Sequence, residues 1–372
     1  MAPLVVALVS IILLALGAPA GAFTRSDWDQ CVQQKLPDAA ISACTRIIQA
    51  AGDTTYGAKA YANRGIGYDL KGDHDRAIED YNVAIRIDPE DAFAYNNRGN
   101  AYRGKGDYDR AIADYNKAIG LDPKFAMAYN NRGAAYKGKG DNERAISDYS
   151  QAILLNPQFA LALVNRGSAY RSQNEYERAI VDFTAAIQNN PTDAKAYFER
   201  GQARLYSGSL PGAVADLERA NELDPHDAYI AIWLEIANER NNLPSTLAAA
   251  ATQLDMDVWP APIVRLFLNQ STISAVLEAT AFDGVIPKKI RVCSGDFYSG
   301  EVALQNGDRE QAVKLFKVAL NECPKDLTEF DGANAELIAL GEKPTKTLEA
   351  EHQQNIKPNI PDVPPKAHKN KR

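Results

Sequence analysis

Histidine is scarce in this chain, with four histidines among 372 residues. His74 and His226 lie in expected turns, and His352 and His368 lie near or in a Lys-rich C-terminal tail, so we expect all four to be solvated. The sequence also lacks a Gly-rich phosphate loop and the motifs His-Glu-x-x-His, Gly-x-Ser-x-Gly and Cys-x-x-Cys. These absences predict a protein that is not an enzyme and that uses neither a cofactor nor a metal.

The chain has no excess of basic residues, because 41 Lys and Arg face 48 Asp and Glu, for a formal net charge of −7. Proteins that hold DNA or RNA regardless of sequence need a basic face. Binding of nucleic acid is therefore disfavoured, although a local basic patch stays compatible with this balance. Hydrophobic residues make up 45% of the chain, which is enough for a packed fold.

The apolar run Leu4–Leu16 is too short to span a membrane, which takes about 20 residues. Small residues in an Ala-x-Ala pattern follow it up to Ala22. This order predicts a secretory signal peptide over residues 1–22, and hence an exported protein, periplasmic if bacterial, that is not stably inserted in a membrane after cleavage. The alternative is a membrane tether by an uncleaved segment, because the segment carries no Lys or Arg.

Self-similarity is what the chain has in abundance, with a period of 34 residues. Columns of proline, glycine and alanine repeat in register, and a bulky side chain recurs between two alanine columns. Chance does not place such columns in register over five periods. The columns are Pro89, Pro123, Pro157, Pro191 and Pro225; Gly65, Gly99, Gly133, Gly167 and Gly201; Ala77, Ala111, Ala145, Ala179 and Ala213; Ala84, Ala118, Ala152, Ala186 and Ala220; and Tyr81, Tyr115, Tyr149, Phe183 and Leu217.

Each period is expected to form two antiparallel helices joined by a turn. Lys-Gly-Asp at 71–73, 105–107 and 139–141 marks the turn, where Gly takes the left-handed conformation and Asp caps the next helix. The proline column ends the second helix, because the residue before proline is pushed out of the helical region. The small Gly and Ala columns allow the two helix axes to approach closely, and the bulky column fills the space beside them.

The motif Tyr61-Ala-Asn-Arg-Gly65-x-x-Tyr68, followed by Ala77-x-x-x-Tyr81 and Pro89, resembles the tetratricopeptide (TPR) repeat, with Tyr in place of the family's Trp. The resemblance implies an all-α fold, a right-handed superhelical α-solenoid of helix-turn-helix repeats closed by a C-terminal capping helix. The expected segments are a signal peptide (1–22), a degenerate opening repeat (24–57), five repeats over 58–227 (58–91, 92–125, 126–159, 160–193 and 194–227), an irregular helical segment (228–292), a final repeat (293–326), a capping helix (326–341) and a disordered tail (342–372).

Residues 200–330 are similar at scattered positions to the C-terminal region of NlpI-type periplasmic lipoproteins. Trp233, Trp259-Pro260 and Asp296-Phe-Tyr-Ser-Gly300 are among these positions. The resemblance implies a scaffold for proteases and peptidoglycan enzymes of the cell envelope. This chain departs from that family by lacking its lipid-anchor cysteine.

Four asparagines share one position on the first helix of successive repeats, the helix that lines the concave face in the TPR fold. A side-chain amide both donates and accepts, so a column of amides could hold the backbone of an extended peptide of any sequence. This resembles the asparagine ladder of superhelical TPR grooves. The alternative is that the amides cap or solvate the groove without a ligand. The column is Asn63, Asn97, Asn131 and Asn165.

An apolar row and a basic row accompany the asparagines and are further candidates for contact with a ligand. The alternative for the apolar row is packing between repeats, and the alternative for the basic row is a solvated face. If both rows bind, the ligand is an extended segment with apolar anchors and some acidic character. The family's clamp for C-terminal carboxylates needs a lysine that this chain lacks, so binding of chaperone tails is disfavoured. The apolar row is Phe93, Met127 and Leu161, the basic row is Arg103, Lys137 and Arg171, and the clamp position holds Ala62, Asn96, Asn130, Val164 and Phe198.

In each repeat an arginine stands directly before the glycine of the repeating column, where the family has an apolar residue. An aspartate accompanies it on the second helix. Five such pairs at matching heights predict a ladder of buried structural ion pairs, whose carboxylates are not catalytic acids. Removing one partner would leave a charge uncompensated, at roughly 3–5 kcal/mol. The pairs are Arg64–Asp80, Arg98–Asp114, Arg132–Asp148, Arg166–Asp182 and Arg200–Asp216.

Four cysteines in an exported chain are expected to pair, because the destination is oxidising. Cys293 should open the first helix of the final repeat and Cys323 close its second, so an antiparallel hairpin brings them to one end. Cys31 and Cys44 lie on the two helices of the opening repeat, but their heights differ by about 5 Å of helix rise, and because a bridge tolerates Cα atoms only to about 7 Å the geometry favours this pair less than Cys293–Cys323. Zinc is the rival for four cysteines, but these lack its ligand spacing.

Two classes of function remain. The first is an exported adaptor or scaffold that binds extended polypeptide segments in the concave TPR groove. The second is a structural subunit of an envelope assembly or secretion complex that acts through self-association. Proteins or peptides are the expected partners in both cases, and homo-oligomers are compatible with either.

Overall fold

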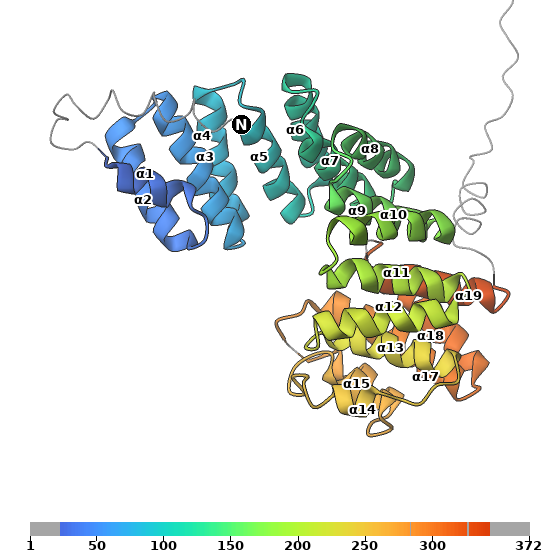
Figure 1. The fold of residues 1–372 in the computed structure, drawn as a ribbon. Coiled ribbons are helices and arrows are strands. Elements are labelled where there is room, and N and C mark those ends of the chain that lie inside the picture. The colour runs from blue at the N-terminus through green and yellow to red at the C-terminus, as the bar shows by residue number, and fades with distance from the viewer. Residues whose placement is uncertain (1–22, 283, 326, 343–372) are drawn as a thin grey trace, which may run out of the picture. The chain divides into compact units, whose positions relative to one another are not determined.

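The computed structural model describes residues 23–282, 284–325 and 327–342, and these residues form helices without any strand (Figure 1). The predicted signal peptide (1–22) and nearly all of the predicted tail (342–372) lie outside the described residues, so both stay predictions. The chain divides into two compact units, Met1–Leu223 and Asp224–Arg372. The predicted all-α TPR solenoid is confirmed.

The first unit is a regular series of helix pairs, and its last five pairs follow the predicted 34-residue repeats. The first helix of the first full repeat starts at Thr55, slightly before the predicted start at residue 58. The helices are α1 (Arg25–Val32), α2 (Pro37–Ala51), α3 (Thr55–Leu70), α4 (His74–Ile87), α5 (Ala92–Gly104), α6 (Tyr108–Leu121), α7 (Ala126–Gly138), α8 (Asn142–Leu155), α9 (Ala160–Ser172), α10 (Tyr176–Asn189), α11 (Ala194–Tyr206) and α12 (Leu210–Leu223).

The turns of the first three full repeats have the predicted chemistry. Gly72, Gly106 and Gly140 have φ angles of 75°, 75° and 79°, in the left-handed region that favours glycine. The following aspartate caps the second helix, and the Asp73 side chain, for example, accepts a hydrogen bond from the Arg76 backbone N–H. In the fourth repeat Asn174 takes the glycine position with a φ of 60°, a substitution that the left-handed region tolerates.

Close contact between the two helices of a repeat explains the glycine column. A Cβ atom added to Gly99 would lie 2.7 Å from the Tyr115 ring, and one added to Gly167 would lie 2.7 Å from the Phe183 ring. The bulky column is at most 1% exposed, from Tyr81 to Leu217. Each repeat therefore buries one large side chain against the bare backbone of its partner helix.

The first helices of the repeats form the inner layer of this unit. Helix α5 packs against α3 and α7, and α9 packs against α7 and α11, across repeat boundaries. The second helices, α4, α6, α8 and α10, contact the neighbouring first helices and lack comparable contacts with one another. Helices that approach more closely lie on the inside of a curve, so the first helices line the concave face, as the TPR resemblance implies.

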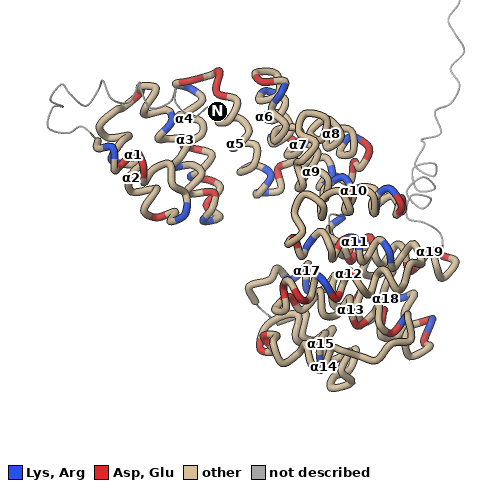
Figure 2. Tube along the Cα trace, viewed as in Figure 1, with Lys and Arg blue, Asp and Glu red and all other residues tan. Residues whose placement is uncertain are grey.

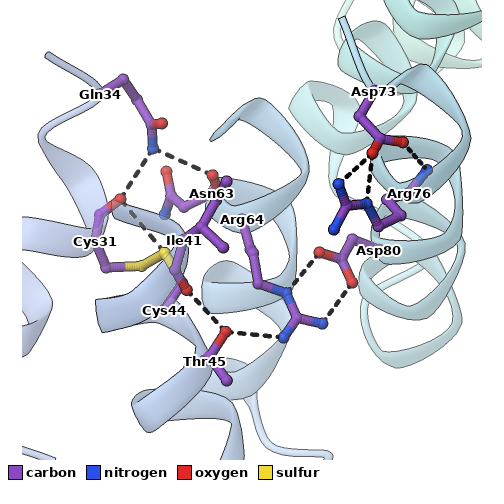
Figure 3. Close-up of polar contacts among 10 residues, drawn as sticks. All are labelled: Cys31, Gln34, Ile41, Cys44, Thr45, Asn63, Arg64, Asp73, Arg76 and Asp80. Atoms are coloured by element: carbon purple, nitrogen blue, oxygen red, sulfur yellow. Dashed lines mark hydrogen bonds and ion pairs between the residues drawn. A yellow bond between two sulfur atoms is a disulfide. The ribbon is translucent and has the colours of Figure 1, made fainter. Parts of the chain in front are cut away.

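The opening repeat is short and carries the predicted Cys31–Cys44 disulfide, with the two Cα atoms 4.8 Å apart. Both cysteines are fully buried, on α1 and α2. The Gln34 side-chain amide donates to the backbone carbonyls of Cys31 and Asn63, which ties this repeat to α3 (Figure 3).

The second unit has less regular helices, and the predicted irregular segment (228–292) contributes four of the helices described there. The predicted capping helix is present with slightly narrower bounds than 326–341. The helices are α13 (Ala228–Arg240), α14 (Leu247–Ala250), α15 (Ala261–Phe267), α16 (Ile273–Ala279), α17 (Lys288–Gln305), α18 (Arg309–Glu322) and α19 (Thr328–Ala339).

The predicted Cys293–Cys323 disulfide is present, with Cα atoms 4.7 Å apart, but one detail of its setting was wrong. We expected Cys293 to open its helix, whereas α17 begins at Lys288 and Cys293 lies in its second turn. The preceding Pro287 takes the N-cap position and starts the helix earlier than the repeat period indicates. Cys323 is the C-cap of α18, as expected.

An aromatic cluster forms the core of the second unit. Trp233 of α13 donates its indole N–H to the Tyr298 hydroxyl at 2.9 Å and stacks on Phe297, with ring centroids 5.7 Å apart. Phe297 and Phe316 link α17 to α18. Among the helices described in the two units, none has both the length and the hydrophobicity to cross a membrane.

Candidate functional site: the concave face of the first unit

The predicted Arg–Asp pairs are all present and connect the two layers of each repeat. Arg64 Nε lies 2.7 Å from Asp80 Oδ2 and its Nη2 lies 2.8 Å from Oδ1, a bidentate geometry (Figure 3). The aspartates are buried. The equivalent contacts join Arg98 to Asp114, Arg132 to Asp148, Arg166 to Asp182 and Arg200 to Asp216, at 2.6–2.8 Å.

Each arginine also reaches the preceding repeat, a contact that the sequence reasoning missed. Arg98 Nη1 donates to Asn82 Oδ1 at 2.7 Å, and Arg64 Nη1 donates to Thr45 Oγ1 at 3.1 Å. The third guanidinium nitrogen therefore bonds a polar side chain of the previous second helix. The sequence signal for this contact is a second polar column with the same period of 34 residues. The column is Asn82, Asn116, Ser150 and Thr184. The ladder thus joins successive repeats as well as the two helices of each repeat.

Three of the four predicted groove asparagines belong to a chain of five amides that crosses the repeats. Asn165 Nδ2 donates to Asn130 Oδ1 at 2.9 Å, and Asn131 Nδ2 donates to Asn96 Oδ1 at 3.0 Å. Within each helix the buried amide donates to the next residue, Asn130 to Asn131 and Asn96 to Asn97, at 3.2 Å. Asn131 thus uses its oxygen and one N–H within the chain and keeps its second N–H for other partners, whereas Asn97 uses only its oxygen and keeps its Nδ2 donors.

Asn63, the fourth predicted asparagine, lies outside this chain. Its Nδ2 donates to the Lys59 backbone carbonyl one turn earlier, at 2.9 Å. The reason is that Ala62 occupies the position of Asn96 and Asn130, so the first repeat has no buried amide to accept from Asn97. Predicting the chain of amides from the sequence requires both the predicted asparagine column and the neighbouring column of Asn96 and Asn130.

The predicted apolar row is open to solvent. Phe93 is 64% exposed, Met127 50% and Leu161 52%, on the inner helices α5, α7 and α9. Phe93 contacts the Phe125 ring, with centroids 4.7 Å apart. Packing between repeats therefore does not account for the row. The same position holds exposed lysines in the first and fifth repeats, Lys59 and Lys195, which sequence reasoning overlooked because it followed only the apolar members.

The predicted basic row is only partly a surface feature. Arg103 is exposed and Lys137 is half-buried, but Arg171 is 3% exposed and its Nη2 lies 3.1 Å from Glu199 Oε2. The assignment of Arg171 to an open basic row was therefore wrong. Glu199 is the fifth member of the asparagine column, and its carboxylate draws the guanidinium in.

The pKa of Glu199 reflects this setting. Burial acts to raise the pKa, but Arg171, Lys195 and Lys137 hold it below its usual value. Three cations thus surround one carboxylate at this end of the face. Elsewhere in the first unit both signs of charge are distributed along the helices, and an acidic stretch lies between α4 and α5 (Figure 2). No three His, Cys, Asp or Glu side chains gather as a metal site anywhere in the described ranges.

Comparison with known proteins identifies the family to which these repeats belong. A family model described as "TPR repeat" matches residues 68–104, 99–140 and 167–206, and one described as "Tetratricopeptide repeat" matches residues 126–159. The crystal structure of MamA is 30% identical, with 43% of this chain and 94% of MamA covered and a TM-score of 0.40. YrrB, described as a TPR protein with an unusual peptide-binding site, is 22% identical, with 55% and 100% covered and a TM-score of 0.42.

PilF of Pseudomonas aeruginosa is 19% identical, with 57% of this chain and 96% of PilF covered and a TM-score of 0.50, which is a likeness of fold alone. The similarity to NlpI-type lipoproteins stays a prediction. Arrays of tetratricopeptide repeats are scaffolds for contacts between proteins. The family-model matches, together with the consecutive helix pairs, show that this chain belongs to the tetratricopeptide-repeat family.

Proposed function

We propose that the chain is an exported adaptor that binds extended polypeptide segments along the concave face of the first unit. The observation that carries this proposal is the exposed apolar row Phe93, Met127 and Leu161 beside amides that keep donor capacity. Water-exposed apolar side chains at one position of three successive helices favour a partner that covers them. An extended peptide suits the amides because its backbone offers unpaired carbonyls along its whole length.

Export is part of the proposal and stands on the cysteines. All four cysteines of the chain are joined in two disulfides. Disulfides persist in secreted and periplasmic proteins and are rare in the cytosol. Mass mapping of the bridges in protein isolated from separated cell fractions, with thiols blocked at lysis, tests this part. Free thiols at all four positions would contradict export.

An array of diverse 13-residue peptides, probed with the full-length chain, tests the groove. Met127→Asp places a charge in the apolar row and should reduce binding at least tenfold for peptides that the unchanged chain binds. Leu154→Asp is the matched control, because Leu154 is 73% exposed on α8, in the other layer. Both substitutions lie at exposed positions, so circular dichroism should show intact folding.

Equal loss of binding in both variants, or none in either, would contradict the groove. Loss with Leu154→Asp alone would favour the second hypothesis, in which the outer layer serves a structural subunit that self-associates. Because residues 200–330 resemble NlpI-type proteins, proteases and peptidoglycan enzymes of the cell envelope are the first partners to test once a peptide is found.

A further inference from the structure

We propose that the concave face binds a polyproline II segment with an acidic residue at each end and an apolar residue at every third position between them. The inference rests on the proposed function and names the ligand of the same face. It concerns one row of five equivalent positions, Lys59, Phe93, Met127, Leu161 and Lys195, which we call the concave row. All five side chains are exposed.

The spacing of the concave row selects the conformation of the ligand. The row takes one residue from each of α3, α5, α7, α9 and α11, and each of these helices packs directly on the next. Packed helices lie about 8–10 Å apart. A polyproline II segment advances about 9.3 Å in three residues and returns to the same face at that point. One repeat therefore matches three ligand residues.

A β-strand does not fit this spacing. Residues on one face of a strand recur every two residues, or about 6.7 Å, and residues three apart point to opposite faces. An α-helix rises only about 4.5 Å in three residues. A polyproline II ligand also suits the amide chain, because its backbone carbonyls make no internal hydrogen bonds. The Nδ2 donors of Asn97 and the second N–H of Asn131 can donate to them.

The charges of the concave row select the ends of the ligand. Lys59 and Lys195 flank the three apolar members, and neither has a carboxylate at ion-pair distance within the described part of the chain, although Lys195 also interacts at longer range with the buried Glu199. Arg103, exposed on α5, adds to this field, whereas the half-buried Lys137 of α7 also interacts with Glu199. A ligand that spans all five positions therefore carries a carboxylate three residues before its first apolar anchor and another three residues after its last.

The chain's own tail provides a contrast in sequence. Proline recurs at Pro358, Pro361 and Pro364, and Ile360 and Val363 are also three residues apart. The positions three residues outside this apolar pair are Lys357 and Lys366. The tail therefore has the same three-residue register, with one apolar position fewer and the opposite charge at its ends. A ligand from another protein is the occupant that the charges favour, and a peptide of residues 355–367 is a natural negative control.

The test uses the full-length chain and fluorescence anisotropy with defined peptides at low ionic strength. The probe has Glu at both ends, Leu at its fourth, seventh and tenth positions and Pro elsewhere. A second peptide replaces both Glu by Lys, and a third keeps the composition but places Leu at every second position. We expect the Glu-ended probe to bind at least tenfold more tightly than either, with an affinity that falls as salt is added.

Reciprocal substitution distinguishes direct contact from a general effect. In the double variant Lys59→Glu and Lys195→Glu, the order should reverse, and the Lys-ended peptide should bind more tightly than the Glu-ended probe. Met127→Asp should weaken both peptides at least tenfold, and Leu154→Asp should weaken neither.

Equal binding of Glu-ended and Lys-ended peptides, an unreversed order in the double variant, or equal binding of the every-second-position peptide would overturn the inference. If arrayed peptides of other patterns still bind and depend on Met127, the proposed function stands and only the ligand assignment fails. If no peptide depends on Met127, both fail.

Discussion

The two compact units bury charged side chains in different proportions. In the first unit each of five buried aspartates has its own arginine partner at 2.6–2.8 Å, and Asp216 has a second one in Arg204. In the second unit a single guanidinium serves two carboxylates, because Arg240 Nη2 lies 2.7 Å from both Glu301 Oε2 and Glu336 Oε1. Balanced pairs can be repeated along a solenoid, whereas an excess of buried carboxylates ties folding to proton binding.

Removing one member of a balanced pair should have the largest effect on stability. Asp148→Ala leaves the Arg132 guanidinium without its carboxylate, and we expect a loss of roughly 3–5 kcal/mol in the free energy of unfolding. The double variant Arg132→Met with Asp148→Leu removes both charges and should lose much less. Urea denaturation followed by circular dichroism measures both. Equal losses in the single and double variants would show that the pair is not a coupled unit.

The disulfides should rank next, at roughly 3 kcal/mol each in the free energy of unfolding of the unit that holds them. Cys323→Ser opens a bridge between residues 30 apart, and Cys44→Ser opens one between residues 13 apart. Tryptophan fluorescence assigns the loss, because Trp28 lies in the first unit and Trp233 and Trp259 lie in the second. A Cys323→Ser variant that destabilises the first unit instead would contradict the division into two units.

The cluster of Arg240, Glu301 and Glu336 predicts that the stability of the second unit, and not that of the first, depends on pH. Burial raises the pKa of Glu301 to about 8, with Glu336 adding to the rise and Arg240 opposing it. Burial also raises the pKa of Asp296 to about 6. The folded state thus holds protons that the unfolded chain has released, so the stabilisation is complete below the usual carboxyl pKa near 4.5 and is lost as the pH rises toward 8.

We expect the free energy of unfolding of the second unit to fall between pH 5 and 8, by up to about 1.4 kcal/mol per pH unit for each proton. Glu301→Gln keeps the shape of the side chain without its charge, so it should flatten this slope. Urea titrations in a Trp28→Phe background, read by the remaining tryptophans, measure the effect. A slope that survives Glu301→Gln unchanged would assign the dependence to other groups.

The amide chain offers the smallest and most local contrast. Asn131→Ala removes the donor to Asn96 and the acceptor from Asn130, so we expect a loss of about 1–2 kcal/mol in the free energy of unfolding. Asn63→Ala removes only a hydrogen bond to the backbone of its own helix, so we expect it to lower the free energy of unfolding by less than half as much. Similar losses in the two variants would show that hydrogen bonds between the amides stabilise the fold no more than hydrogen bonds to water.

The periodic half of the molecule was predictable because each residue type repeats its physical role. A turn glycine at a positive φ and an aromatic ring under a bare backbone each recur in four of the five repeats, and an aspartate cap recurs in three, so their positions reinforce one another in the sequence. Arg171 was misplaced because its setting depends on a single exception, Glu199, in an otherwise regular column. The buried cluster around Arg240 joins residues 61 and 96 positions apart without repetition, and no local pattern predicts such contacts.

The two-sided contact of each arginine has a consequence for how the solenoid can grow. Arg98 bonds Asn82 in the repeat before it, and its own repeat supplies Asn116 to Arg132 in the repeat after it. The unit of residues 92–125 therefore presents to its successor the same polar group that it receives from its predecessor. A tandem copy of this segment would find both of its interfaces already satisfied. The nearest-neighbour couplings that hold the present array together are thus also the ones that permit its duplication.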